Sequence, residues 1–82
     1  MSDASELRRL QWRCRRGMKE LDVLLERYLE HAYLAADESR RQAFARLLEL
    51  QDPELHAQLL GEAHVADEVT RDVIRSITRP VP

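Results

Sequence analysis

The chain has 82 residues, a formal net charge of -2 and one cysteine. A chain of this length folds as one domain with a small core, which favours surface recognition over an enclosed enzyme pocket. The near-neutral charge provides no global basic field of the kind that drives nonspecific nucleic-acid binding, and a lone cysteine excludes an intramolecular disulfide. No apolar run reaches the roughly 20 residues of a membrane span, and the first residues lack a secretory signal pattern. We therefore expect one cytoplasmic domain over residues 1–82, ordered from about residue 5 to residue 79.

Glycine and proline are scarce, and no segment alternates in the manner of a strand, so the sequence predicts an all-α protein, a compact bundle of about five short helices. The first helix should run from about Ser5 to Arg15, with Leu7, Leu10 and Cys14 facing the core. The second and longest helix should begin at Gly17 or Met18. Its apolar residues recur at helical spacing and form the main wall of the core: Met18, Leu21, Leu25, Tyr28, Leu29 and Ala32.

Capping residues predict the boundaries of three further helices. Asp37 is a candidate N-cap for the third, which carries Phe44, Leu47 and Leu48. Asp52-Pro53-Glu54 predicts an N-cap followed by proline at the first helical position of the fourth, and Gly61 should stop that helix. The fifth should start near Asp67, bury Val69, Val73, Ile74 and Ile77, and end before Pro80 with Arg75 and Arg79 in its closing turns. The first few residues and Pro80 to Pro82 should be loose.

A basic cluster lies in the N-terminal third, where every charged residue from Arg8 to Lys19 is basic. Within it, Gly17 has two interpretations: it closes the first helix, or its missing side chain lets a partner's backbone approach. Arg16 and Glu20 form an ordinary surface ion pair if the helix is continuous. If the helix breaks at Gly17, both side chains are free, and Arg16 can bind a carboxylate, phosphate or carbonyl group of a partner.

Other residues with reactive or aromatic side chains have simpler interpretations. Cys14 lies on the apolar stripe, and we assign it to packing despite the nearby arginines. Trp12 is either a core residue or a partly exposed anchor at an interface. His31 and Tyr33 are candidate surface contacts at the end of the second helix, whereas Tyr28 belongs to the core stripe. The three histidines have no metal-ligand spacing, so we expect no metal site.

Two sequence blocks resemble one known family. The signature Arg-Gly-x-x-Glu of the small succinate dehydrogenase assembly factors that promote flavinylation is matched within the run Arg15-Arg16-Gly17-Met18-Lys19-Glu20-Leu21-Asp22. Upstream, Trp12-x-Cys14 has the family's spacing. Downstream, Leu47-Leu48-Glu49 and Asp52-Pro53-Glu54-Leu55 resemble its second block, although His56 stands where members more often carry an aromatic residue.

The resemblance implies a five-helix protein without catalytic residues that binds the flavoprotein subunit of succinate dehydrogenase, with that of fumarate reductase as a further candidate. It implies that the protein promotes covalent attachment of FAD to this partner and binds no cofactor stably itself. Arg16, Gly17 and Glu20 are then the residues that face the flavoprotein. Arg15, Lys19 and Asp22 flank them, and Trp12, His31 and Tyr33 are additional candidate contacts. We expect a monomer.

Two interpretations from other classes compete with this one. The first is a small helical nucleic-acid-binding module that uses the basic segment 8–19, which predicts an affinity that falls steeply with added salt. The second is an enzyme that binds flavin itself, which predicts that the isolated protein is yellow or turns over a substrate.

Overall fold

Five helices make up the computed structural model, which describes residues 3–61, 63–65 and 67–79. They are α1 (Asp3–Cys14), α2 (Lys19–His31), α3 (Glu38–Glu49), α4 (Asp52–Leu59) and α5 (Glu68–Thr78), and these residues contain no strand. The prediction of an all-α bundle is therefore confirmed. The expectation that both chain ends are loose concerns mainly residues 1–2 and 80–82, which lie outside the described residues.

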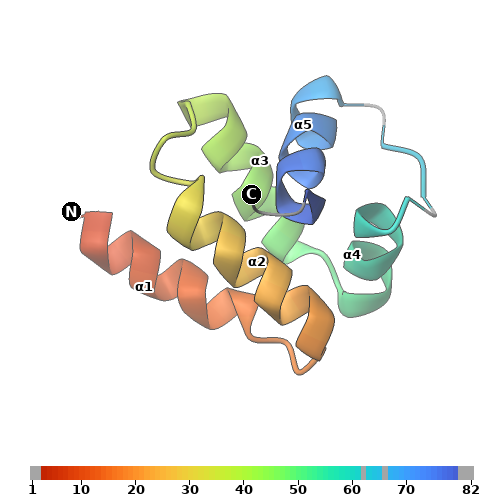
Figure 1. Cartoon of the computed structure of the whole chain (residues 1–82), viewed down its shortest axis with the longest axis horizontal. Helices are drawn as coiled ribbons and strands as arrows, with labels where there is room; N and C mark the ends of the chain where they lie inside the picture. The colour runs from red at the N-terminus through yellow and green to blue at the C-terminus, as the bar shows by residue number, and fades with distance from the viewer. Residues whose placement is uncertain (1–2, 62, 66, 80–82) are drawn as a thin grey trace.

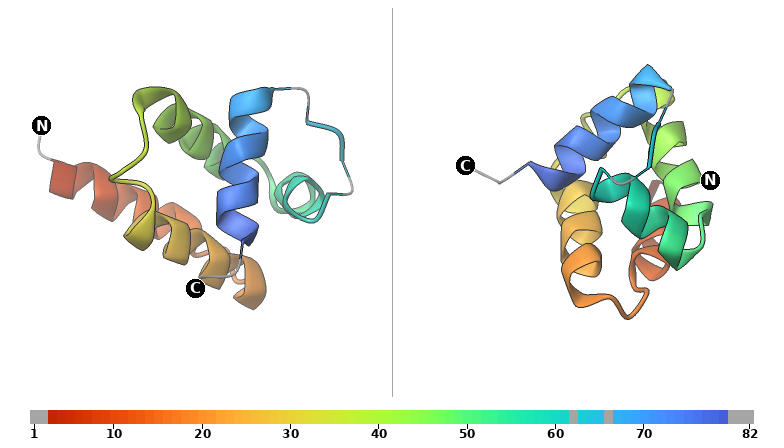
Figure 2. Two further views of the ribbon diagram at one scale, coloured as in Figure 1. Left: turned by 45° about the horizontal axis from the view of Figure 1, so that its top comes forward. Right: turned by 90° about the vertical axis from the view of Figure 1, so that its right-hand side faces the viewer.

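The helices pack in two groups around a shared core. α1 and α2 lie side by side and antiparallel, joined by a short loop at the bottom of Figure 1. α3 and α5 pack against each other, and both contact this hairpin, α3 through α1 and α5 through α2. The short α4 lies beside α5 and is joined to it by the long connection seen in Figure 2. This arrangement brings the α1–α2 loop near the junction between α3 and α4.

The core is centred on Phe44, whose side chain is fully buried. Its ring lies 4.7 Å from the ring of Tyr28 and 5.8 Å from that of Tyr33, measured between centroids. The apolar stripes predicted for α1, α2, α3 and α5 belong to the core, and five of their residues are only partly buried: Leu7, Met18, Ala32, Val69 and Ile74. The fully or nearly fully buried members of the stripes are Leu10, Cys14, Leu21, Leu25, Leu29, Leu47, Leu48, Val73 and Ile77.

One of the two predicted N-caps is confirmed, and the fifth helix begins directly after Asp67, as predicted. Asp37 accepts a hydrogen bond from the backbone N–H of Arg40 at 2.9 Å, and Asp67 accepts one from that of Thr70 at 3.0 Å. Hydrogen bonds from the Thr70 hydroxyl and backbone lower the pKa of the Asp67 carboxyl. The other predicted N-cap was wrong by one residue: Gln51 is the N-cap of α4, and Asp52 lies inside its first turn. Gly61 has a φ of +78° just after α4 and stops it as predicted.

Cys14 is a packing residue, as the sequence predicts. Its thiol is buried, and this burial raises its pKa to about 12, with the nearby Glu26 carboxylate acting in the same direction. Because the thiolate is the reactive form, we expect the folded protein to react with a thiol reagent at pH 8 at least about a hundredfold more slowly than an exposed thiol. A Ser39→Cys variant provides the control, since Ser39 is exposed on α3. Equal reaction rates for Cys14 and the introduced thiol would contradict the assignment.

Candidate partner-binding site

The loop between α1 and α2 breaks the helical path at Gly17. Gly17 has a φ of +82°, a conformation that side-chain-bearing residues rarely adopt, and α2 begins only at Lys19. A Cβ atom built at Gly17 would meet nothing within 4 Å. The backbone conformation therefore requires glycine, while the space around it is open. Both interpretations from the sequence fit this geometry, because the residue ends the helical segment and also leaves room for another molecule.

Asp22 holds this loop from the first turns of α2. Its two carboxylate oxygens accept hydrogen bonds from the backbone N–H groups of Arg16 and Gly17, each at 3.0 Å. Two N–H groups beyond the end of α1 are thus paired by one side chain. The sequence prediction placed Asp22 beside the partner, and the structure gives it this internal contact.

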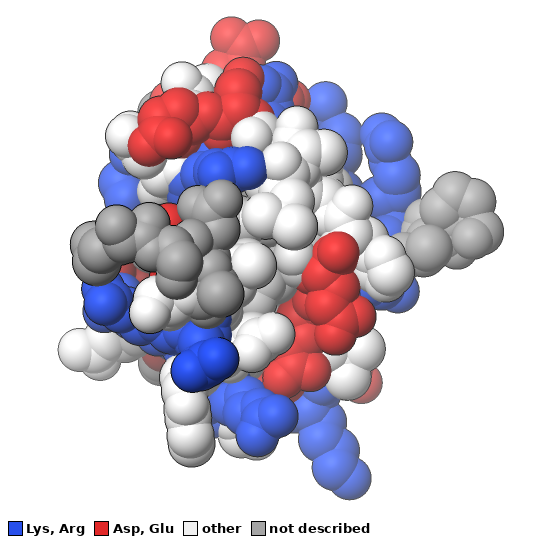
Figure 3. Space-filling view, turned by 90° about the vertical axis from the view of Figure 1, so that its left-hand side faces the viewer, with Lys and Arg blue, Asp and Glu red and all other residues white. Residues whose placement is uncertain are grey.

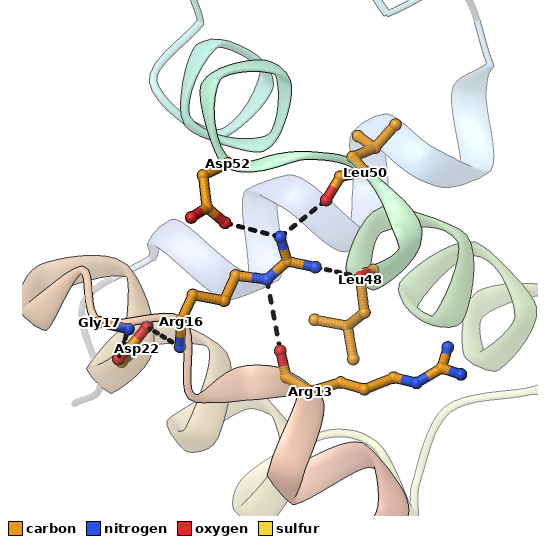
Figure 4. Close-up of polar contacts among 7 residues, drawn as sticks. All are labelled: Arg13, Arg16, Gly17, Asp22, Leu48, Leu50 and Asp52. Carbon is orange, nitrogen blue, oxygen red and sulfur yellow. Dashed lines mark hydrogen bonds and ion pairs between the residues drawn. The ribbon is translucent and has the colours of Figure 1, made fainter.

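Arg16 points into the protein, contrary to the expectation that its side chain is free (Figure 4). Its Nη1 donates to the carbonyl of Leu50 at 2.7 Å and to the Oδ1 of Asp52 at 2.9 Å, and its Nη2 donates to the carbonyl of Leu48. Its Nε donates to the carbonyl of Arg13 at 3.3 Å. Only 13% of the side chain is exposed. Arg16 is therefore paired with Asp52 instead of Glu20, and its guanidinium joins the α1–α2 loop to the α3–α4 junction.

The remaining charged residues of the motif face outward. Lys19 and Glu20 are exposed at the start of α2. Arg15 is also exposed and lies 3.5 Å from a carboxylate oxygen of Glu26, an ion pair in solvent that adds little stability. Trp12 is 72% exposed on α1, which decides between its two interpretations in favour of an exposed residue.

Val23 is a candidate contact that the sequence analysis missed. It is 61% exposed and lines a shallow depression with Lys19, Glu20 and Leu24. Its position could have been found from helical spacing, because Val23 falls opposite the stripe formed by the buried residues of α2. We use the term tip surface for six exposed residues in or near the loop: Trp12, Arg15, Gly17, Lys19, Glu20 and Val23.

The two candidates at the end of α2 do not join the tip surface. Tyr33 is 3% exposed, so its prediction as a surface contact was wrong. It packs on Phe44, lies under the Arg41 guanidinium, and its hydroxyl donates to a Glu6 carboxylate oxygen at 3.3 Å. Burial, with Glu6 acting in the same direction, raises the pKa of Tyr33. His31 is exposed, but it lies about 18 Å from Lys19 at a rise of about 1.5 Å per residue.

Neither a metal site nor a membrane-spanning element was found in the described part of the chain. There, no group of three or more His, Cys, Asp and Glu side chains could hold a metal ion. No helix within residues 3–61, 63–65 and 67–79 is long and apolar enough to cross a membrane. What the site does offer is an exposed glycine turn of fixed conformation, flanked by an aromatic residue and by charges of both signs.

Comparison with known proteins places this chain in a family. The model of a family described as "Flavinator of succinate dehydrogenase" matches residues 8–81. The chain belongs to this family. The match includes both the motif around Gly17 and the second block around Asp52, which Arg16 joins in space.

Several relatives carry the name "FAD assembly factor SdhE". The protein from Methylococcus capsulatus is 54% identical over 63 residues, which cover 77% of this chain and 76% of the relative. The protein from Idiomarina loihiensis is 44% identical over 68 residues, which cover 83% of this chain and 76% of the relative. The protein from Coxiella burnetii is 35% identical over 77 residues, which cover 94% of both chains. This family membership confirms the resemblance found in the sequence.

Proposed function

We propose that this protein binds the flavoprotein subunit of succinate dehydrogenase and promotes the covalent attachment of FAD to it. The observation that carries the proposal is the family match over residues 8–81, within which the motif forms an exposed turn. The turn is held by Asp22 and Arg16, so its shape exists before any partner arrives. A preformed surface loses less entropy on binding, which favours recognition of another protein.

The protein acts by stabilising one conformation of its partner. Attaching a flavin to a protein histidine requires the flavin ring methyl group and that histidine in near-attack geometry, with negative charge stabilised on the flavin as a proton leaves. Lys19 and Glu20 of the tip surface are exposed to water, where electrostatic stabilisation of charge is weak. We therefore assign the chemistry to the flavoprotein. The assembly factor binds the conformation competent for the linkage and raises its population, without binding FAD stably itself.

The test is the covalent flavin fluorescence of the succinate dehydrogenase flavoprotein on a denaturing gel. Cells with the gene intact, deleted, or deleted and complemented are compared at equal flavoprotein levels. We expect the signal to be lost on deletion and restored by complementation. A signal unchanged by deletion would refute the proposal. The same gel, probed for the flavoprotein of fumarate reductase, tests whether that protein is a second client. This second client, the monomeric state and the cytoplasmic location stay predictions.

The nucleic-acid alternative receives no support. Within the segment 8–19, the Arg16 side chain is directed inward and Arg15 is paired with Glu26. On the face seen in Figure 3, basic side chains are interspersed with acidic and uncharged ones. The net charge of -2 provides no global basic field from which counterion release could supply affinity for nucleic acid.

A further inference from the structure

We propose that Arg16 is a positioning residue for flavoprotein binding. Its largely buried side chain holds the turn at Gly17 in place against the α3–α4 junction. The proposal rests on the proposed function and assigns a different role to the motif's arginine. Instead of touching the partner, Arg16 fixes the shape of the tip surface that does.

The guanidinium of Arg16 finds its hydrogen-bond partners within the chain. Arginine carries five N–H donors in a rigid plane, and here donors from all three nitrogens are used within the chain. Two of the acceptors, the carbonyls of Leu48 and Leu50, lie at the end of α3, where carbonyl groups lack partners within the helix. A third acceptor is the Asp52 carboxylate, at 2.9 Å. With 13% of its surface exposed, the side chain has little left to offer another molecule.

Arg16 is held at both its side chain and its backbone. Its side chain is bound to the α3–α4 junction, while its backbone N–H is bound to Asp22 of α2, 3.0 Å away. The next N–H along the chain, that of Gly17, is bound to the second oxygen of the same carboxylate. The exposed turn at Gly17 is therefore tied to two separate parts of the protein. Because binding costs less when a loop is already ordered, these contacts contribute to affinity without lying in the interface.

Asp52, the side-chain acceptor of Arg16, belongs to the second sequence block. If Arg16 acts by positioning, a change at Asp52 must weaken partner binding through the same contact. If Arg16 touches the partner directly, Asp52 and Arg16 contribute independently. Glu54 is a matched control, because it is an exposed acid in the same first turn of α4.

The experiment is a double-mutant cycle with Arg16→Gln, Asp52→Ala and their combination, alongside Glu54→Ala. The dissociation constant for the purified flavoprotein is measured well below the melting temperature of each variant. We expect Asp52→Ala to weaken binding by about threefold to tenfold and Arg16→Gln by more, while the double variant binds about as weakly as Arg16→Gln alone. Glu54→Ala should bind within about twofold of the unmodified protein. Asp52→Asn, which keeps an acceptor oxygen, provides a milder variant if Asp52→Ala folds poorly.

Amide hydrogen exchange in the free protein gives a second measurement that needs no partner. We expect Asp52→Ala to accelerate exchange of the Gly17 N–H, and Glu54→Ala to leave it unchanged. Unchanged exchange in Asp52→Ala, or effects on binding that simply multiply in the double variant, would overturn the positioning role. Failure of the unmodified protein to bind the flavoprotein would instead overturn the proposed function on which this role rests.

Discussion

Replacing Gly17 with arginine should abolish covalent flavinylation of the succinate dehydrogenase flavoprotein while the variant itself stays folded. The φ of +82° makes any side chain costly there, by about 1–2 kcal/mol, which a folded domain can tolerate. The space around Gly17 is empty within the chain, so the new side chain projects from the tip surface. It then blocks close approach of a partner. Covalent flavin fluorescence at equal flavoprotein levels measures the effect, and circular dichroism checks the fold.

Gly61→Arg is the matched control for this prediction. Gly61 has nearly the same φ, +78°, and a Cβ there would also meet nothing within 4 Å. The substitution therefore adds the same strain and the same charge, but at the end of α4 instead of the α1–α2 loop. We expect flavinylation to stay normal in Gly61→Arg. Equal loss in both variants would show that strain alone accounts for the effect, and retained flavinylation in Gly17→Arg would exclude a close approach at Gly17.

Replacing Phe44 with alanine should lower the free energy of unfolding by about 3–5 kcal/mol. Phe44 is fully buried and contacts both core tyrosines, so the change removes apolar burial and leaves a cavity between α2 and α3. Domains have total stabilities of about 5–15 kcal/mol, and one this small lies toward the lower end. Much of the variant should therefore be unfolded at physiological temperature. Urea denaturation followed by circular dichroism measures the difference.

Leu34→Ala is the control for Phe44→Ala. Leu34 is also a large apolar residue, but it is 55% exposed in the connection before α3. Its truncation should change the free energy of unfolding by no more than about 0.5 kcal/mol. A loss below about 1 kcal/mol for Phe44→Ala would contradict its place at the centre of the core.

Features set by short stretches of sequence were predictable. The Asp37 and Asp67 caps act within three residues of themselves, and the apolar stripe of α2 repeats at helical spacing. Asp52 shows where this reasoning fails, because its type and place before Pro53 suit an N-cap. In the folded protein, its carboxylate is bound to Arg16 from a distant part of the chain. A tertiary contact has replaced the local one.

The candidate site also combines features that could be predicted from the sequence with features that could not. The exposed positions of Gly17, Lys19 and Glu20 follow from the break between the first two helices. The inward direction of Arg16 does not, because two of its acceptors are backbone carbonyls, which carry no side-chain signal in the sequence. Tyr33 lies beyond the end of α2, so helical spacing cannot place it, and only packing against Phe44 shows that it is buried.

The contacts of Arg16 also affect how the motif is interpreted in other sequences. Its guanidinium satisfies carbonyl groups at the end of α3, a task that the fold requires whether or not a partner is present. A related sequence could retain this arginine after losing its client. Gly17 also has a role in the fold, because its φ of +82° requires glycine, whereas Glu20 lies in solvent. When distant relatives are sorted by activity, the glutamate is therefore the most informative position of the signature.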